Sequence, residues 1–295
     1  MKIFLDENGK TAHLKIKKGD FPRYILSPGS PERVRQIGEL LENCVEVCDN
    51  RGLTGVKGIY KGLEVGAVNT GMGPASASII VPEIIEGMGD FEKATIIRVG
   101  TCGSLQPHVG VGDLIVSKGV IRDETTTAKW VPLEYPAIAS LGATLSLVEA
   151  GRDYGYGVGG RKDNSKNLWV GVTHAKDELY AVENPDGTPM GDIRKMVLNA
   201  YKKMGTLSTE MEFTVFALYA EMYNSTMREN KKSSILDAGC ILLCLSPCHD
   251  VTEGGAIEFH HPDQKPMLEI ALDALVKKAK IDEGKHELSQ IINGF

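Results

Sequence analysis

The sequence predicts an α/β fold in which a central β-sheet carries helices on both of its faces. Short apolar runs rich in β-branched residues alternate along the chain with longer stretches that have the apolar spacing of helices. Several strand-like runs end directly in Gly-rich turns, and α/β sheets bind ligands at such strand ends. A hydrophobic fraction of 42% and a charged fraction of 24% in 295 residues are typical of a folded globular protein.

The first half of the chain contains three expected strands, which are apolar runs bounded by turn residues. Two of these strands lead through Gly-containing turns into stretches with a helical apolar stripe. In chain order the expected elements are the strand 24–26, the helix 31–41, the strand 63–69, the helix 75–86 and the strand 93–99.

The second half of the chain continues the alternation and ends in a closing helix. The expected elements are the strand 113–118, the helix 136–154, the strand 168–172, the helices 192–203 and 210–223, the buried strand 239–245 and the helix 264–279. Two polar stretches, 155–166 and 224–234, are expected to be surface insertions. Neither has the composition of a domain linker, so we expect one domain over residues 1–295.

Composition excludes several classes of function. The net charge of −6 provides no general attraction to polyanions, which argues against nucleic-acid binding. The polar residues 1–10 do not resemble an export signal, and the longest apolar runs are too short to span a bilayer. We therefore expect a protein that acts in the cytoplasm and does not bind membranes.

The six cysteines indicate neither disulfides nor a metal site. They do not form the dense framework of a secreted domain, and close CxxC pairs with further ligands are missing. Cys44 and Cys48 are four residues apart in a stretch expected to be helical. Cys240, Cys244 and Cys248 are also spaced by four, which on a strand would put all three on one face. We expect small buried side chains and no metal.

The first candidate site is the turn at residues 27–33, between a strand and a helix. Gly29 allows backbone N–H groups to approach an anion, and the start of a helix adds positive potential. Arg33 in the first helical turn can bind phosphate oxygens with two N–H groups. A Gly/Pro turn with a solvated arginine explains the same residues.

The second candidate site is the end of the strand 93–99. Arg98 interrupts an apolar run, and a buried arginine is costly unless an anion pairs with it. The following turn offers the backbone of Gly100 and the hydroxyl of Thr101. The sequence therefore favours an anion site, with a structural salt bridge as the alternative.

The third candidate site is Glu210-Met211-Glu212 at the start of an apolar helix. An acid near Ser208 or Thr209 is typical of helix capping. Glu212 could instead accept hydrogen bonds from a sugar diol. The sequence alone leaves both interpretations open.

These three signals, in this order, resemble the nucleoside phosphorylase family that includes uridine phosphorylase and the hexameric purine nucleoside phosphorylases. The resemblance extends from about His13 to the last helix. Residues 105–113 and 132–137 look closest to uridine phosphorylases, and residues 51–62 look closer to the purine enzymes. The resemblance implies a single-domain, three-layer α/β/α fold with a mixed, partly barrel-like sheet.

The resemblance implies a phosphate site built from separate parts of the chain. Gly29 and Arg33 match the first phosphate-binding turn of the family. Arg98, Gly100 and Thr101 match the second. Inorganic phosphate is then a co-substrate, and no cofactor is expected.

Other matched residues imply sugar contacts and a shared active site. Arg51 matches an arginine that reaches the phosphate of a neighbouring subunit, and His13 matches a histidine offered to that subunit's ribose 5′-hydroxyl. Met211 and Glu212 match ribose contacts, and Glu210 matches an acid near the base or sugar. The resemblance therefore implies at least a dimer, with a hexamer as the family's usual assembly.

The base site departs from both groups of relatives. Leu179 stands where uridine phosphorylases have an aromatic residue, and Glu183 and Pro185 stand where they read uracil with glutamine and arginine. We expect Leu179, Glu183 and Glu210 to contact the base in some other way.

The proton donor of the purine enzymes is also not matched. The position of their aspartate falls near Ser246 or Pro247, and His249 and Asp250 follow in the same loop. Gly52 replaces the glutamate of a potassium site found in some uridine phosphorylases, so no such site is expected.

We therefore expect an enzyme, a pentosyltransferase that reversibly splits a ribonucleoside with phosphate into free base and ribose 1-phosphate. Uridine is the favoured substrate. The alternatives are a purine nucleoside phosphorylase acting on inosine, guanosine or adenosine, a nucleosidase of the same fold that uses water, and a nucleoside-binding protein without activity. Arg98 and Glu212 are the expected catalytic residues.

Overall fold

A single mixed sheet runs through the centre of the computed structural model, which describes residues 2–160, 166–248 and 258–292. Its strand order is β10-β9-β6-β11-β5-β1-β4-β3-β2, with β7 paired to β6 and β8 paired to β9. The strands are β1 Tyr24–Pro28, β2 Glu42–Asn50, β3 Leu53–Tyr60, β4 Leu63–Val68, β5 Lys93–Ser104, β6 Leu114–Asp123, β7 Ala137–Ile138, β8 Gly157–Val158, β9 Asn167–Lys176, β10 Ser208–Glu210 and β11 Ile235–Ser246.

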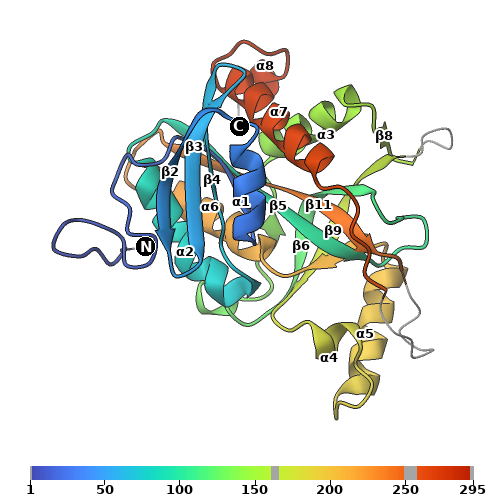
Figure 1. Ribbon diagram of the computed structural model, residues 1–295. Helices are drawn as coiled ribbons and strands as arrows, with labels where there is room; N and C mark the ends of the chain where they lie inside the picture. Colours follow the sequence, from blue (N-terminus) through green and yellow to red (C-terminus); the bar gives the residue numbers. More distant parts are fainter. Residues whose placement is uncertain (1, 161–165, 249–257, 293–295) are drawn as a thin grey trace.

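Helices cover both faces of this sheet (Figure 1). The helices are α1 Pro31–Gly38, α2 Gly73–Met88, α3 Leu141–Asp153, α4 Tyr180–Glu183, α5 Gly191–Lys203, α6 Phe213–Glu229, α7 Lys265–Asp282 and α8 Ser289–Ile292. One apolar core lies between the sheet and α2 and α6, and a second lies between the sheet and α1, α3 and α7. The expected three-layer α/β/α arrangement is confirmed.

Part of the sheet closes on itself. The short strand β10 pairs in parallel with β9 and antiparallel with β5, so β5, β11, β6, β9 and β10 form a ring. This is the partly barrel-like sheet that the family resemblance implies. Closure places the backbone of Thr209 directly between Gly103 on β5 and His174 on β9.

The parallel pairing of β1 with β5 brings the first two candidate sites together. Ser27 lies opposite Arg98, and Pro28 lies opposite Val99. The turn at Gly29 therefore leaves β1 beside the end of β5 that carries Arg98. Residues about 70 positions apart in the sequence thus meet at one edge of the sheet.

The structure corrects several expected elements. Cys44 and Cys48 lie on the strand β2 and not on a helix. Most of β2 is exposed and polar, so it lacks the alternation by which half-buried strands are predicted. The helix expected from residue 136 begins at Leu141, because Ala137–Ile138 pairs with β6 as strand β7.

The expected surface insertions are partly regular structure. Helix α6 continues through Asn224 to Glu229, which removes half of the insertion expected at 224–234. In the stretch 155–166, Gly157–Val158 forms β8, and residues 161–165 lie outside the described part of the chain. Within residues 2–160, 166–248 and 258–292, no helix is long and apolar enough to cross a membrane.

Helix α7 supplies much of the second core, which yields a stability prediction. Leu272 on α7 is completely buried. Leu272→Ala should lower the free energy of unfolding by about 2–5 kcal/mol, because the lost side chain leaves a cavity. Urea denaturation at fixed protein concentration measures the change.

Lys280 on the same helix provides a matched control. Its side chain is exposed, so Lys280→Ala should change the free energy of unfolding by less than about 0.5 kcal/mol. Equal losses for the two variants would contradict the packing of α7 described above.

Candidate active site

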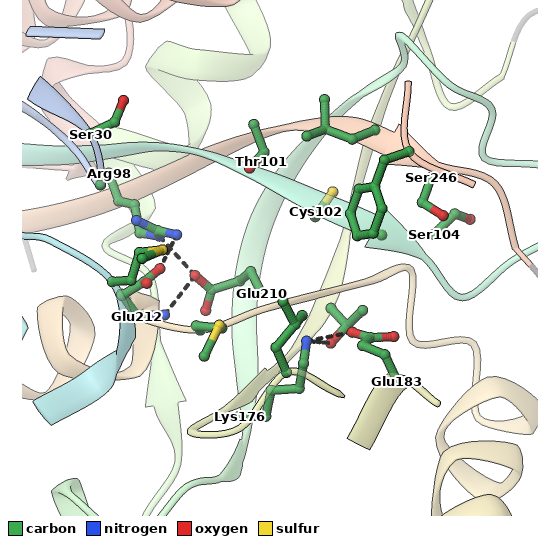
Figure 2. A pocket seen from close by; sticks show the side chains of 18 of the residues that line it. Ser30, Arg98, Thr101, Cys102, Ser104, Lys176, Glu183, Glu210, Glu212 and Ser246 are labelled. Carbon is green, nitrogen blue, oxygen red and sulfur yellow. Dashed lines mark hydrogen bonds and ion pairs between the residues drawn. The ribbon is translucent and has the colours of Figure 1, made fainter. Parts of the chain in front are cut away.

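A pocket of about 260 Å³ opens where the ends of β1, β5, β9, β10 and β11 meet (Figure 2). It has the concave, partly apolar character of small-molecule sites. The structure brings most of the expected site residues together there. Those that line it are Gly29, Arg33, Arg98, Thr101, Leu179, Glu183, Glu210, Met211 and Glu212.

Arg98 is the central cation of this pocket. Its residue is only 4% exposed, and its Nε donates to Glu210 Oε2 at 2.7 Å while its Nη2 pairs with Glu212 Oε2. Burial alone would lower the pKa of Arg98, but the carboxylates of Glu212 and Glu210 outweigh it and raise the pKa. Arg98 is therefore a fixed, permanently charged donor.

One nitrogen of Arg98 still has hydrogen-bonding capacity. Its Nη1 is buried and has no hydrogen-bond partner among the residues that the structure describes. A buried donor without a partner is costly, and a charged one more so. The arrangement favours an anionic ligand that accepts this hydrogen bond.

Arg33 forms a second cation beside it. Ser30 is the N-cap of α1, and its hydroxyl accepts the Arg33 backbone N–H at 3.4 Å, which fixes the start of the helix. The guanidinium Nη1 of Arg33 donates to the Val99 carbonyl at 2.8 Å. Burial and then the nearby charge of Arg98 lower the pKa of Arg33 to about 10. An anion between the two arginines would relieve this repulsion.

Glu212 and Glu210 share Arg98 but have different surroundings. Glu212 Oε1 accepts the Gly73 backbone N–H at 2.6 Å, at the start of α2. Burial raises the pKa of Glu212, and the charge of Glu210 adds to the rise against the opposing effect of Arg98. Glu212 thus lines the pocket as a carboxylate held by two fixed donors.

Glu210 acts largely as a helix cap. Its Oε2 accepts the Glu212 backbone N–H at 2.8 Å, and its Oε1 accepts the Phe213 N–H at 2.9 Å. These are two of the free amides at the start of α6. The capping interpretation therefore describes Glu210, and its carboxylate also orients Arg98.

Gly100 contributes space beside Arg98. A Cβ at Gly100 would lie 2.9 Å from Arg98 Nη2 and 2.9 Å from a methyl carbon of Leu242. Gly100 is not among the described residues that line the pocket, whereas Thr101 is. The glycine lets the guanidinium fold back along the strand.

The other end of the pocket contains an ion pair that was not expected from the sequence. Figure 2 shows Lys176 and Glu183 together, well separated from Arg98. Lys176 Nζ lies 2.5 Å from Glu183 Oε1 and donates to Thr209 Oγ1 at 2.6 Å. Lys176 is a single cation at the end of the strand β9, just as Arg98 is a single cation in the strand β5. This similarity was the sequence signal by which Lys176 could have been found.

His13 and Arg51 lie elsewhere on the chain. His13 Nδ1 contacts Glu83 Oε1 at 2.7 Å, and Asn50 Nδ2 donates to the His13 carbonyl at 2.6 Å. Arg51, the next residue after Asn50, is exposed in the turn between β2 and β3. Neither His13 nor Arg51 is among the described residues that line the pocket of the same chain.

The loop after β11 is only partly described. Ser246 and Pro247 line the pocket. His249 and Asp250 lie outside the described residues. No group of three or more His, Cys, Asp or Glu side chains in the described part of the chain is arranged to hold a metal ion.

Comparisons with solved structures agree with the geometry. The crystal structure of uridine phosphorylase from Vibrio fischeri ES114 superposes with a TM-score of 0.72, covering 92% of this chain and 100% of that one at 22% identity. At that identity the similarity establishes the fold.

Sequence comparisons establish the family. A uridine phosphorylase from Thermococcus kodakarensis is 30% identical over 281 residues, covering 95% of this chain and 90% of the relative. The uridine phosphorylase of Escherichia coli is 31% identical over 68% of this chain and 76% of its own length, and a guanosine phosphorylase from Halorubrum lacusprofundi is 32% identical over 58% and 65%. The family model described as the phosphorylase superfamily matches residues 23–227, so the chain belongs to the phosphorylase superfamily.

Proposed function

We propose that this protein is a nucleoside phosphorylase that converts a ribonucleoside and inorganic phosphate into free base and ribose 1-phosphate. The observation that carries the proposal is the buried Nη1 of Arg98, a charged donor without a described partner. It lies in one pocket with Arg33 and with the carboxylate of Glu212. A dianion and a sugar diol are the two chemical groups that such a site would recognise.

In this proposal, phosphate binds between Arg33 and Arg98. Two guanidinium groups orient the phosphate oxygens and hold the anion beside the sugar, which supplies the proximity effect. A phosphate oxygen forms a bond to ribose C1′ as the C1′–N bond to the base breaks. The hydrogen phosphate gives up the proton that the departing base gains overall.

Glu212 is the proposed ribose contact. Each carboxylate oxygen has one protein donor, Gly73 N–H or Arg98, and each retains a further lone pair. The ribose 2′- and 3′-hydroxyls can donate to those lone pairs. The negative charges of Glu212 and phosphate also stabilise the cation-like sugar of the transition state.

Glu210 has a positioning role in this scheme in place of the expected base contact. Its two oxygens already accept from Arg98 Nε and from the amides of Glu212 and Phe213. These contacts lie at the end of the pocket that holds Arg98. We therefore assign base contacts to the end that holds Leu179 and Glu183.

Uridine is the proposed substrate, because the Thermococcus relative that covers nearly the whole chain is a uridine phosphorylase. The similarity to the guanosine phosphorylase of Halorubrum makes a purine nucleoside the second candidate substrate. A nucleosidase is disfavoured, because water needs neither Arg33 nor the unpaired nitrogen of Arg98.

The proposed enzyme is an oligomer in which neighbours share active sites. His13 and Arg51 lie close together, since Asn50 joins the turn of Arg51 to the His13 carbonyl. Both are absent from the described lining of their own pocket. We propose that they serve the pocket of a neighbouring subunit, which requires at least a dimer; a hexamer of such dimers follows the family resemblance.

The reaction itself can be tested with a substrate panel. The purified protein should release uracil from uridine only when phosphate is present, and ribose 1-phosphate should accumulate in equal amount. Thymidine, inosine, guanosine and adenosine in the same assay would identify the accepted base. Equal release with and without phosphate would exclude phosphorolysis.

Arg33→Gln should raise the KM for phosphate about 10- to 100-fold, because it removes a charge-assisted interaction with the anion. The KM for the nucleoside should change much less. Steady-state kinetics with each substrate varied in turn measures both values.

Arg35 gives the matched control for this variant. It is exposed on the same helix, two residues after Arg33, so Arg35→Gln should leave both KM values near those of the unmodified protein. An unchanged phosphate KM in Arg33→Gln would contradict the proposed phosphate site.

Sharing of active sites can be tested by mixing two defective variants. An Arg51→Ala subunit and an Arg33→Gln subunit together form one site in which both arginines are intact. Each mixed dimer therefore has one intact site of two, and random pairing of equal amounts makes half of the dimers mixed. The jointly refolded sample should thus reach about a quarter of the unmodified activity.

The measurement is the activity of the two variants after joint refolding, compared with each variant refolded alone. Additive, low activity after mixing would show that Arg51 does not reach a neighbour's pocket.

A further inference from the structure

We propose that Lys176 is a catalytic residue whose ammonium group neutralises the negative charge that develops on the leaving base. This inference rests on the proposed phosphorylase function and names the group that supports the departing base. It replaces the uracil-reading glutamine and arginine, which this sequence lacks at Glu183 and Pro185.

Burial of Lys176 is the first argument. The residue is 1% exposed and yet lines the pocket. Removing an ammonium group from water costs several kcal/mol unless its partners compensate, so a buried lysine is a poor device for stability alone. Buried ionisable groups beside a ligand pocket commonly take part in binding or catalysis, so the position of Lys176 indicates a functional role.

The second argument is that the ammonium group is held in place. Lys176 Nζ is paired with Glu183 Oε1 at 2.5 Å and donates to Thr209 Oγ1 at 2.6 Å. An ammonium group has three donors, and the described partners use two of them. The third donor is available to a base in the pocket.

A hydrogen-bonded chain continues behind Thr209. Thr209 Oγ1 lies 3.2 Å from His174 Nδ1, and His174 Nε2 lies 3.0 Å from Asp123 Oδ2. Lys176 can only donate, so Thr209 Oγ1 accepts from it, and the Thr209 hydroxyl keeps one proton and one lone pair for its contact with His174 Nδ1.

This chain continues to the neighbouring helix. Arg194 on α5 donates to Asp123 Oδ2 at 2.8 Å, so the carboxylate is held by both a cation and an imidazole. The Asp123 pKa is lowered by these contacts, although burial opposes them. Through Thr209, Lys176 thus joins a network of hydrogen bonds, which restricts its movement.

The third argument is the position of Lys176 relative to the phosphate site. Figure 2 shows Arg98 and Glu212 at one end of the pocket and Lys176 with Glu183 at the other. A nucleoside whose ribose contacts Glu212 has its base directed away from the phosphate. The base then occupies the end that holds Lys176, Leu179 and Ser246.

The chemistry of the step requires such a group. When the C1′–N bond breaks, its electron pair moves onto the base and spreads to the conjugated carbonyl oxygens. The Lys176 ammonium donates a hydrogen bond to one of these oxygens and keeps its own proton. Glu183 can accept a ring N–H of the same base, so the pair suits oxo bases with adjacent N–H and C=O groups.

The test compares two leaving groups of unequal acidity. Fluorine at position 5 withdraws electrons, so 5-fluorouracil leaves as an anion more easily than uracil. Lys176→Met should lower kcat/KM for uridine by about 100- to 1,000-fold, as for other donors to a developing anion. The loss for 5-fluorouridine should be markedly smaller, because that base depends less on Lys176.

A second variant controls for misfolding of Lys176→Met. Lys176→Met leaves Glu183 without its lysine, so the double variant with Glu183→Gln also removes that negative charge. It should show the same dependence on the leaving group. Lys277→Met is the control, because Lys277 is paired with Asp153 and Glu149 on α3, outside the pocket, and should show no such dependence.

Two results separate this inference from the proposed function. Equal losses for uridine and 5-fluorouridine in both Lys176 variants would overturn the role of Lys176 and leave phosphorolysis intact. Absence of phosphate-dependent base release in the unmodified protein would instead overturn the proposed function.

Discussion

The buried cluster of Arg98, Glu210 and Glu212 determines the geometry of the rest of the site. Through Glu210 it joins β5 to the strand that closes the ring and to the first amides of α6. Through Glu212 it reaches the first residue of α2, Gly73. Four elements thus meet at one guanidinium. Replacing a buried ionic cluster by apolar residues of similar volume is often neutral or stabilising, so orientation explains this cluster better than stability does.

The same arrangement occurs at both ends of the pocket. Strand β10 is only three residues long and lies between β5 and β9, which carry Arg98 and Lys176. Its residue Glu210 binds Arg98, and its preceding residue Thr209 binds Lys176. Closing the ring therefore fixes the distance between the two cations, which sets the length of ligand that both ends can contact.

Local patterns predicted most helices and strands and the residues around Arg98. Arg98 was recognisable because a single charge interrupts an otherwise apolar run. Lys176 was missed because Asp177 and Glu178 follow it directly, and the three residues together resemble a polar loop. Strand β2 was missed because its exposed, charged face has no apolar alternation.

Long-range pairing was beyond prediction for a different reason. The antiparallel contact of Ser208 with Ser104 joins residues about 100 positions apart, and it depends on β6, β9 and β11 all being in place. No local propensity encodes such a closure. The sequence also left open whether Glu210 caps a helix or contacts a ligand. The answer depends on the position of Arg98, which is set by the same long-range pairing.

The charge balance of the pocket is consistent with the proposed sharing of active sites between subunits. The described lining contains three cations, Arg33, Arg98 and Lys176, and three carboxylates, Glu183, Glu210 and Glu212. These charges cancel, so a bound phosphate dianion would leave a buried excess of negative charge.

In the proposed shared site, an additional cation would compensate that excess before the sugar becomes positive in the transition state. Burial, and then the charge of Glu210, raise the pKa of Glu212 against the effect of Arg98, which is the direction expected where further negative charge is disfavoured. The proposed Arg51 of a neighbouring subunit would supply the missing positive charge without adding a fourth buried cation to the isolated chain. Subunit assembly would then complete the phosphate site electrostatically, and a separated subunit would bind phosphate weakly even with its own arginines intact.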